Sequence, residues 1–230
     1  MNVPLSIDGG TLTGWGLWRP GLPKPRGGVL EMPDVERDIG WWGEAFLDWV
    51  IPFSRLEGVT EMVFEAPIIV KHKRAGAERC QACGQTKSDI NFHEVEKLVS
   101  LSAFAKFGAR QLGIPFRSVQ RGVVSKHFVG VGPRDKDFNS KYLKSAFIVC
   151  CQRKGWEVAS AKHPQDLADA LGTLDWYVHD RGIKVPWNCQ PAPGPLFEQR
   201  GVRIDATNQA AAKRLINSAL SFDREKQGVR

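Results

Sequence analysis

One short stretch near the start of the chain constrains the fold more than any other, Ser6–Leu17. An apolar run ends in Asp8, then Gly9 and Gly10 follow, and a second alternating run comes after them. This order predicts a strand, a tight turn and another strand. The turn leaves a carboxylate at the end of a buried strand, and the two glycines let backbone approach a phosphate or a metal. Asp8 is therefore a candidate ligand for a hard divalent cation, although an aspartate that only caps a turn has the same pattern.

A second acid is predicted at the end of a later strand. The segment Glu61–Pro67 has the pattern of a short strand that ends in Glu65 and is stopped by a proline. Val63 and Phe64 indicate an interior strand, whereas a solvated edge strand would leave Glu65 as an ordinary surface residue.

Two further acids lie on a helix that is predicted to begin at Pro164. Asp166 and Asp169 are three residues apart and share one face, while apolar residues occupy the opposite face. Two like charges on one face repel unless a cation lies between them, and a metal ion is such a cation. The alternative is a helix-start charge at Asp166 and an ordinary surface position at Asp169. Asp175, further along the helix, is expected to tolerate asparagine.

The remaining periodic segments predict the framework around these acids. Strands are predicted at Leu5–Asp8, Gly14–Trp18, Val29–Leu30 and Ile114–Val119, and helices at Ile39–Leu56, His93–Leu112, Val123–Phe128, Ser140–Lys154 and Ala206–Phe222. Pro52 is expected to end or kink its helix. The stretch Pro186–Pro195 is predicted to be an extended linker.

Charge and cysteine content restrict the partners and the compartment. Lys and Arg total 32 against 25 Asp and Glu, a net charge of +7 that favours a polyanionic partner. No apolar run has the length of a membrane span, the first residues lack the pattern of a signal peptide, and the five cysteines are an odd number. We therefore expect a cytoplasmic protein with no membrane partner, in the bacterial host cell if a phage encodes it.

The segment around residues 68–92 interrupts the pattern and is expected to be an insertion. Cys80 and Cys83 form a Cys-x-x-Cys-Gly turn, which can be half of a zinc site. His72 and His93 flank it and could complete four Zn²⁺ ligands. A basic surface loop with two free thiols is the alternative.

The order of strands and acids resembles the RNase H-like superfamily, and within it the RuvC family of Holliday-junction resolvases, especially the divergent bacteriophage forms. The resemblance is carried by Ile7–Trp15, Val63–Pro67, Lys126–Gly132 and Asp166–Leu171, and it covers roughly Asn2 to Arg181. It implies an α/β fold, RNase H-like, with a mixed five-stranded sheet flanked by helices. Residues 1–182 would form the nuclease domain, and residues 183–230 a linker with a C-terminal helical extension.

The resemblance also implies a site and an activity. The expected catalytic and metal-binding acids are Asp8, Glu65, Asp166 and Asp169, which would hold two Mg²⁺ or Mn²⁺ ions. Lys126 and Lys136 would lie near the scissile phosphate, with Lys141 as an alternative to Lys136. The activity would be an endonuclease of DNA recombination and repair. A homodimer would cut four-way DNA junctions by paired nicks that leave a 5′ phosphate and a 3′ hydroxyl.

Two other functions compete with this one. A non-catalytic DNA-binding protein could keep the same fold. An actin-like or sugar-kinase-like ATPase also opens with an Asp-x-Gly-Thr turn, but that fold needs a second copy of the turn, which this chain lacks.

Overall fold

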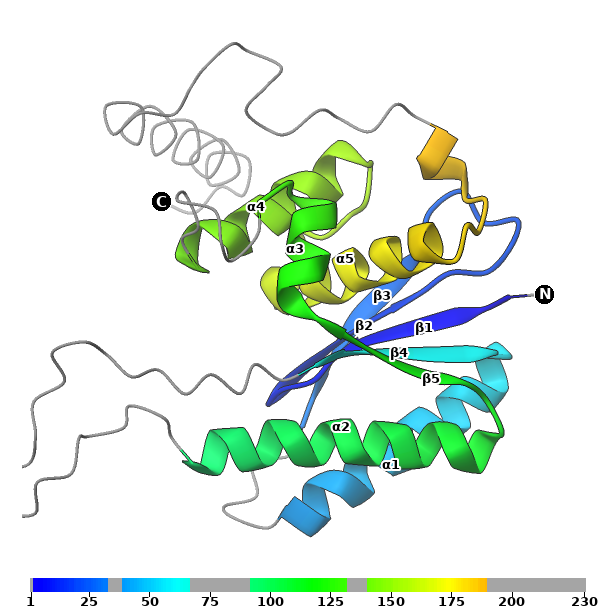
Figure 1. The fold of residues 1–230 in the computed structure, drawn as a ribbon, viewed down its shortest axis with the longest axis vertical. Helices are drawn as coiled ribbons and strands as arrows, with labels where there is room; N and C mark the ends of the chain where they lie inside the picture. Colours follow the sequence, from blue (N-terminus) through cyan, green and yellow to red (C-terminus); the bar gives the residue numbers. More distant parts are fainter. Residues whose placement is uncertain (1, 33–38, 67–91, 132–139, 190–230) are drawn as a thin grey trace, which may run out of the picture. The chain divides into compact units, whose positions relative to one another are not determined.

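The computed structural model describes residues 2–32, 39–66, 92–131 and 140–189. Its strands are β1 (Pro4–Asp8), β2 (Leu12–Leu17), β3 (Arg26–Glu31), β4 (Glu61–Ala66) and β5 (Phe116–Gln120). Its helices are α1 (Ile39–Glu57), α2 (Phe92–Leu112), α3 (Arg121–Phe128), α4 (Ser140–Arg153) and α5 (Pro164–Asp180), followed by the 3₁₀ turn η1 (Pro186–Cys189). The described strands form one sheet in the order β3-β2-β1-β4-β5. The predicted mixed five-stranded α/β fold is therefore confirmed (Figure 1).

The sheet is mixed because its central strand has one partner of each kind. β1 pairs antiparallel with β2 and parallel with β4, and β5 continues the parallel half beyond β4. The carboxyl ends of β1, β4 and β5 consequently meet at one edge of the sheet. Asp8 and Glu65 lie at this edge, as their positions at strand ends predicted.

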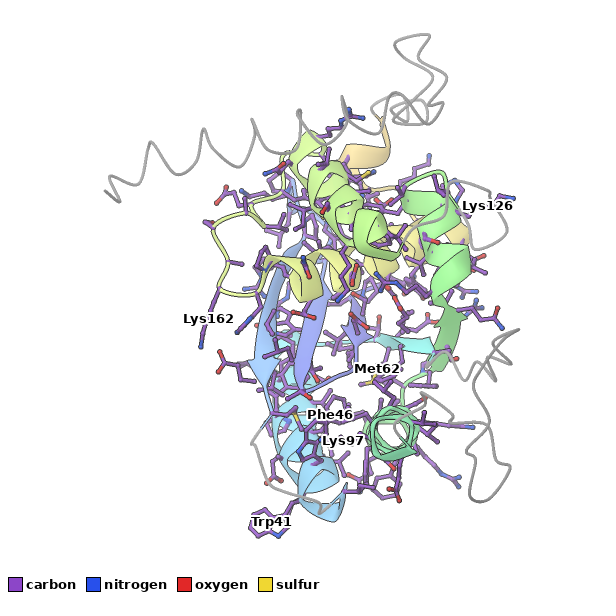
Figure 2. The ribbon with its side chains drawn as sticks, turned by 90° about the vertical axis from the view of Figure 1, so that its left-hand side faces the viewer. Trp41, Phe46, Met62, Lys97, Lys126 and Lys162 are labelled. Carbon is purple, nitrogen blue, oxygen red and sulfur yellow. The ribbon has the colours of Figure 1, made fainter. Side chains whose placement is uncertain are left out.

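Alternation along the strands sends apolar and polar residues to opposite faces of the sheet. Ile7 and Phe64, which are paired in register, face the layer formed by α1 and α2 and join its apolar core. Phe46 of α1 and Met62 of β4 belong to the same core and are labelled in Figure 2. By the same alternation, the residues that follow Ile7 and Phe64 are on the opposite face of the sheet. The layer of α3, α4 and α5 covers that face (Figure 1).

Glycines in β2 and β3 allow α5 to lie very close to the sheet. A Cβ at Gly14 would be 2.1 Å from the carbonyl oxygen of Asp166, and one at Gly27 would be 2.6 Å from the side chain of Leu167. Such distances are shorter than van der Waals contact, so a side chain at either position would push the helix away. The first turn of α5 therefore lies next to the β1–β2 hairpin.

Two local features needed the structure to decide them. Helix α1 continues past Pro52 to Glu57, close to the predicted bounds Ile39–Leu56, so of the two expected effects of Pro52 the structure excludes an end. Pro52 is exposed, while Val50 and Ser54 on either side of it are buried, so tertiary packing outweighs the missing backbone hydrogen bond. The linker predicted from Pro186 begins instead as η1, because Trp187 is buried there.

Backbone contacts divide the chain into a unit Met1–Pro191 and a unit Ala192–Arg230. The sequence placed its boundary at residue 182. The helix predicted at Ala206–Phe222 lies outside the described residues. Among the helices that the structure describes, none is both long enough and apolar enough to cross a membrane.

Candidate active site

Asp8 and Glu65 are brought together by the parallel pairing of β1 with β4. Ile7 is opposite Phe64 in this ladder, so Asp8 follows beside Glu65 and on the same face. Glu65 is buried, with 8% of its surface exposed, and Asp8 is half-buried. The hairpin after Asp8 is closed by Thr13, whose Oγ1 donates a hydrogen bond to the carbonyl oxygen of Gly10 at 2.8 Å.

Helix α5 supplies the other two acids from its first turns. The hydroxyl of Ser6 in β1 donates a hydrogen bond to the carbonyl oxygen of Ala170 at 2.7 Å, which ties the helix to the central strand beside Asp169. Asp169 is 3% exposed and Asp166 is half-buried. Asp169 is therefore not the ordinary surface residue of the alternative interpretation.

The electrostatics show that the four acids lie within reach of one another. Burial raises the pKa of Asp8 well above its usual value, and the charges of Glu65, Asp169 and, more weakly, Asp166 raise it further. Burial also raises the pKa of Glu65 to about 7, although Arg121 opposes the rise. Asp8, Glu65, Asp166 and Asp169 therefore act on one another through their charges, and they are called the acidic cluster here.

Arg121 is a site residue that the sequence analysis missed. Its Nη1 donates to both carboxylate oxygens of Glu65, at 3.0 and 3.3 Å, and its Nη2 lies 2.8 Å from Oδ1 of Asp169. The guanidinium carbon lies 5.2 Å from the ring centre of Phe147 on α4. Arg121 is the first residue of α3, directly after β5, and this place in the sequence was the available signal because β5 ends beside β4.

The donor set of the acidic cluster fits a hard divalent cation. It consists of carboxylate oxygens, which Mg²⁺ and Mn²⁺ prefer. Oδ1 of Asp169 is buried and lacks a hydrogen-bond partner among the described residues, although Nη2 of Arg121 lies 2.8 Å from it. Within the described part of the chain, however, no three His, Cys, Asp or Glu side chains stand close enough to hold a metal as they are now placed. The guanidinium of Arg121 contacts both Glu65 and Asp169 and bridges the two carboxylates.

The predicted phosphate-binding lysines are only partly described. Lys126 is exposed on α3 and points outward (Figure 2). Lys136 lies outside the described residues, and only the backbone of Lys141 is described. Lys144 on α4, which the sequence analysis did not single out, lowers the pKa of Asp169 through its charge. The catalytic roles of these lysines stay predictions.

The predicted zinc ligands also lie outside what the structure describes. Cys80, Cys83 and His72 fall in residues 67–91, and of His93 only the backbone is described, in the first turn of α2. The zinc site therefore stays a prediction.

The expectation that Asp175 tolerates asparagine conflicts with its surroundings. It is buried, with 3% of its surface exposed. It accepts a hydrogen bond from the indole of Trp187 at 2.8 Å and lies 3.0 Å from Nε2 of His127 and 3.2 Å from Nζ of Lys154. Asp175 therefore joins η1, α3 and the end of α4 to α5, and it cannot serve as a neutral control.

A hollow of about 480 Å³ lies between α1 and α2. It is on the opposite face of the sheet from the acidic cluster. Its lining includes Glu44, Asp48, Leu47 and Phe104. Acidic and apolar groups do not suit a phosphate, so this hollow does not compete with the acidic cluster as a site for a polyanion.

Comparison with solved structures places the chain among RuvC-like folds. It is similar to a Thermus thermophilus RuvC structure, with a TM-score of 0.52, 16% sequence identity, and coverage of 79% of this chain and 97% of that one. It is also similar to T. thermophilus RuvC in complex with a Holliday junction substrate, with a TM-score of 0.53, 16% identity, and coverage of 80% and 98%. No protein-family model and no curated protein matches the chain. The predicted RNase H-like, RuvC-like fold is therefore confirmed.

Proposed function

We propose that the chain is a metal-dependent endonuclease that cleaves branched DNA, with four-way junctions as its main substrate. The observation that carries the proposal is the acidic cluster, in which four carboxylates from β1, β4 and α5 meet at one edge of the sheet. Clustered, partly buried carboxylates destabilise the folded protein unless a cation binds them, so their assembly indicates a function.

The fold and the charge support this substrate class. The fold is that of RuvC, and one of the similar structures is a RuvC bound to a Holliday junction. The net charge of +7 favours a polyanion such as DNA. The neighbour is only 16% identical, so the choice of junctions over other branched DNA rests on this proposal and on the tests below.

In the proposed mechanism, the acidic cluster would hold two Mg²⁺ or Mn²⁺ ions, which when bound would activate a water and stabilise the charge that develops on the phosphate. Asp8 lies on the central strand between the other acids and is our candidate for the shared ligand. Glu65 and Asp169 would flank it, and Asp166 would complete one site. Lys144, whose charge reaches Asp169, is placed to attract the DNA phosphate.

Resolution of a four-way junction needs two cuts on opposing strands. A two-fold homodimer would provide two copies of the acidic cluster and would match the symmetry of the DNA. We therefore propose a homodimer that makes paired nicks and leaves 5′ phosphates and 3′ hydroxyls.

The replacement Asp8→Asn tests the proposed function. Asparagine keeps the shape of the side chain but removes the charge that would hold the cations. We expect nicking of a four-way junction in Mg²⁺ to fall by at least about a hundredfold, because metal ligation is worth several kcal/mol in the transition state. Junction binding in EDTA should change little, and the metal-free protein should melt at a higher temperature because repulsion is relieved.

Asp180→Asn is the control for this experiment. Asp180 is the last residue of α5, is exposed, and pairs with Arg117 at the surface. It should nick and bind like the unchanged protein. If Asp8→Asn nicks at the normal rate, the mechanism is wrong. If the unchanged protein binds junctions but never cuts them, the non-catalytic DNA-binding alternative is correct.

A further inference from the structure

The strongest unexplained contact of the acidic cluster is the one that Arg121 makes. Its side chain is only 17% exposed, and its guanidinium reaches Glu65 on β4 and Asp169 on α5 at the same time. Glu65 and Asp169 in turn raise the pKa of Arg121, although burial opposes its charge. The pairing is therefore unlike the exposed ion pairs elsewhere on the described surface, such as Lys24 with Glu157.

A guanidinium and a divalent metal that contact the same carboxylates repel each other and share a limited number of lone pairs. The guanidinium of Arg121 bonds both oxygens of Glu65 and lies 2.8 Å from the one buried oxygen of Asp169 that lacks a hydrogen bond. A metal that takes Glu65 and Asp169 as ligands needs these atoms.

We propose that Arg121 is the resident counter-ion of the acidic cluster and competes with divalent metal for Glu65 and Asp169. The inference rests on the proposed function, in which these acids bind metal. In the metal-free protein the guanidinium neutralises part of the clustered charge and keeps the fold stable. Metal binding displaces it, so the measured metal affinity includes the loss of the Arg121 contacts. Arg121 is thus a positioning residue that sets the metal concentration at which the site becomes occupied.

The test is a calorimetric titration of the full chain with Mn²⁺ alone, without DNA. Arg121→Gln removes the competing charge, and we expect Mn²⁺ to bind about tenfold more tightly, within the usual range of coupling between two ligands. The same variant should melt at a lower temperature than the unchanged protein in EDTA, and Mn²⁺ should raise its melting temperature by more.

Arg117→Gln is the matched control. It removes the same charge from the same strand region, but Arg117 is 41% exposed and pairs with Glu61 and Asp180, away from the acidic cluster. Its Mn²⁺ affinity should stay within about twofold of the unchanged protein, because exposed charges are screened by solvent and salt.

A second replacement keeps the inference testable if Arg121→Gln does not fold. Arg121→Lys retains the charge but cannot bridge two carboxylates with one planar fork, so Mn²⁺ should still bind several-fold more tightly. Equal or weaker Mn²⁺ binding by the folded Arg121 variants would overturn the inference. Suppose that the Arg121 variants bind Mn²⁺ no more tightly than the unchanged protein. If Asp8→Asn loses Mn²⁺ binding in the same experiment, the acidic cluster does bind metal and only the role of Arg121 is refuted. If Asp8→Asn binds Mn²⁺ normally, the proposed function fails with it.

Discussion

Two aspartates on α5 show how neighbouring groups decide what a buried carboxylate does. Asp169 and Asp175 are each 3% exposed and belong to the same helix. Burial raises the pKa of Asp169 above its usual value even though Arg121 opposes it. Burial acts on Asp175 in the same direction, but the bond to His127 and the charge of Lys154 outweigh it and hold its pKa below the usual value. The neighbours of Asp169 thus only partly offset the burial of its charge, whereas the neighbours of Asp175 stabilise its charged form.

At this scale, we expect Asp175→Asn to destabilise the protein by about 3 kcal/mol, because one partner of a buried charged network is removed while Lys154 remains. The melting temperature should fall by roughly 6–12 °C for a unit of this size. Thermal denaturation measures the change. The control Asp180→Asn removes an exposed partner of Arg117 and should cost less than about 1 kcal/mol.

The stabilising effect of Asp175 should also depend on pH. Its pKa is lower in the folded chain than in the unfolded chain, so the unfolded state binds more protons between the two values. The stabilisation is therefore complete above pH ~5 and is lost as the pH falls through about 4 and below. Urea denaturation from pH 7 to pH 3 should show the difference between the unchanged protein and Asp175→Asn shrinking with acid. A constant difference would mean that the charge of Asp175 is not what stabilises the network.

At the scale of elements, the site depends on how closely α5 approaches the β1–β2 hairpin. Gly14 is opposite Asp8 in the ladder, and it faces the carbonyl oxygen of Asp166. The absence of a side chain at Gly14 lets the first turn of α5 come near enough for its acids to reach Asp8. The glycine therefore links the fold of the sheet to the assembly of the acidic cluster.

We expect Gly14→Ala to cost about 3 kcal/mol and to lower nicking, because the new methyl group would lie 2.1 Å from the Asp166 carbonyl oxygen and force α5 outward. Gly10→Ala in the same hairpin is the control. Its nearest neighbour would be the backbone oxygen of Leu12 at 3.4 Å, an ordinary contact. Thermal melting and a nicking assay on both variants provide the comparison, and equal behaviour would remove Gly14 from this role.

At the scale of the whole molecule, the net charge of +7 predicts salt-dependent DNA binding that does not need metal. The basic residues of the insertion, Lys71, Lys73 and Arg74, are expected to contact phosphates, although they lie outside the described residues. Replacing all three with glutamine should weaken junction binding and lower the slope of log K against log[salt] by up to about 3. Binding titrations in EDTA at several salt concentrations measure the slope.

The control for this charge change is the triple replacement of Lys24, Arg26 and Lys162. Replacing them with glutamine removes the same total charge as the change in the insertion. These three residues, however, pair with Glu157, Glu57 and Glu31 on the described surface. Their replacement should leave the salt slope nearly unchanged. Equal slopes in both triple variants would remove the insertion from the DNA footprint.

The sequence alone determined the order and type of the elements and the positions of the four acids. Period-2 and period-3.6 patterns are local, so they placed Asp8 and Glu65 at strand ends and Asp169 on a helix without reference to any long-range contact. The meeting of Asp8 with Glu65 follows from the parallel pairing of β1 with β4, which the tertiary structure supplies.

Only the tertiary structure decided which side chains neutralise these acids. Arg121 reaches Glu65 because β5 pairs with β4, and Asp175 is buried because Trp187 of η1 folds back onto α5. Both contacts join residues from different elements of the fold. The periodicity of the sequence within one element cannot predict which side chains of another element will contact it. The packing of α1 likewise allows the helix to continue past Pro52, where local propensity predicted an end or a kink. Burial and long-range pairing thus outweighed local preference, because each buried carboxylate requires partners that only the folded chain can supply.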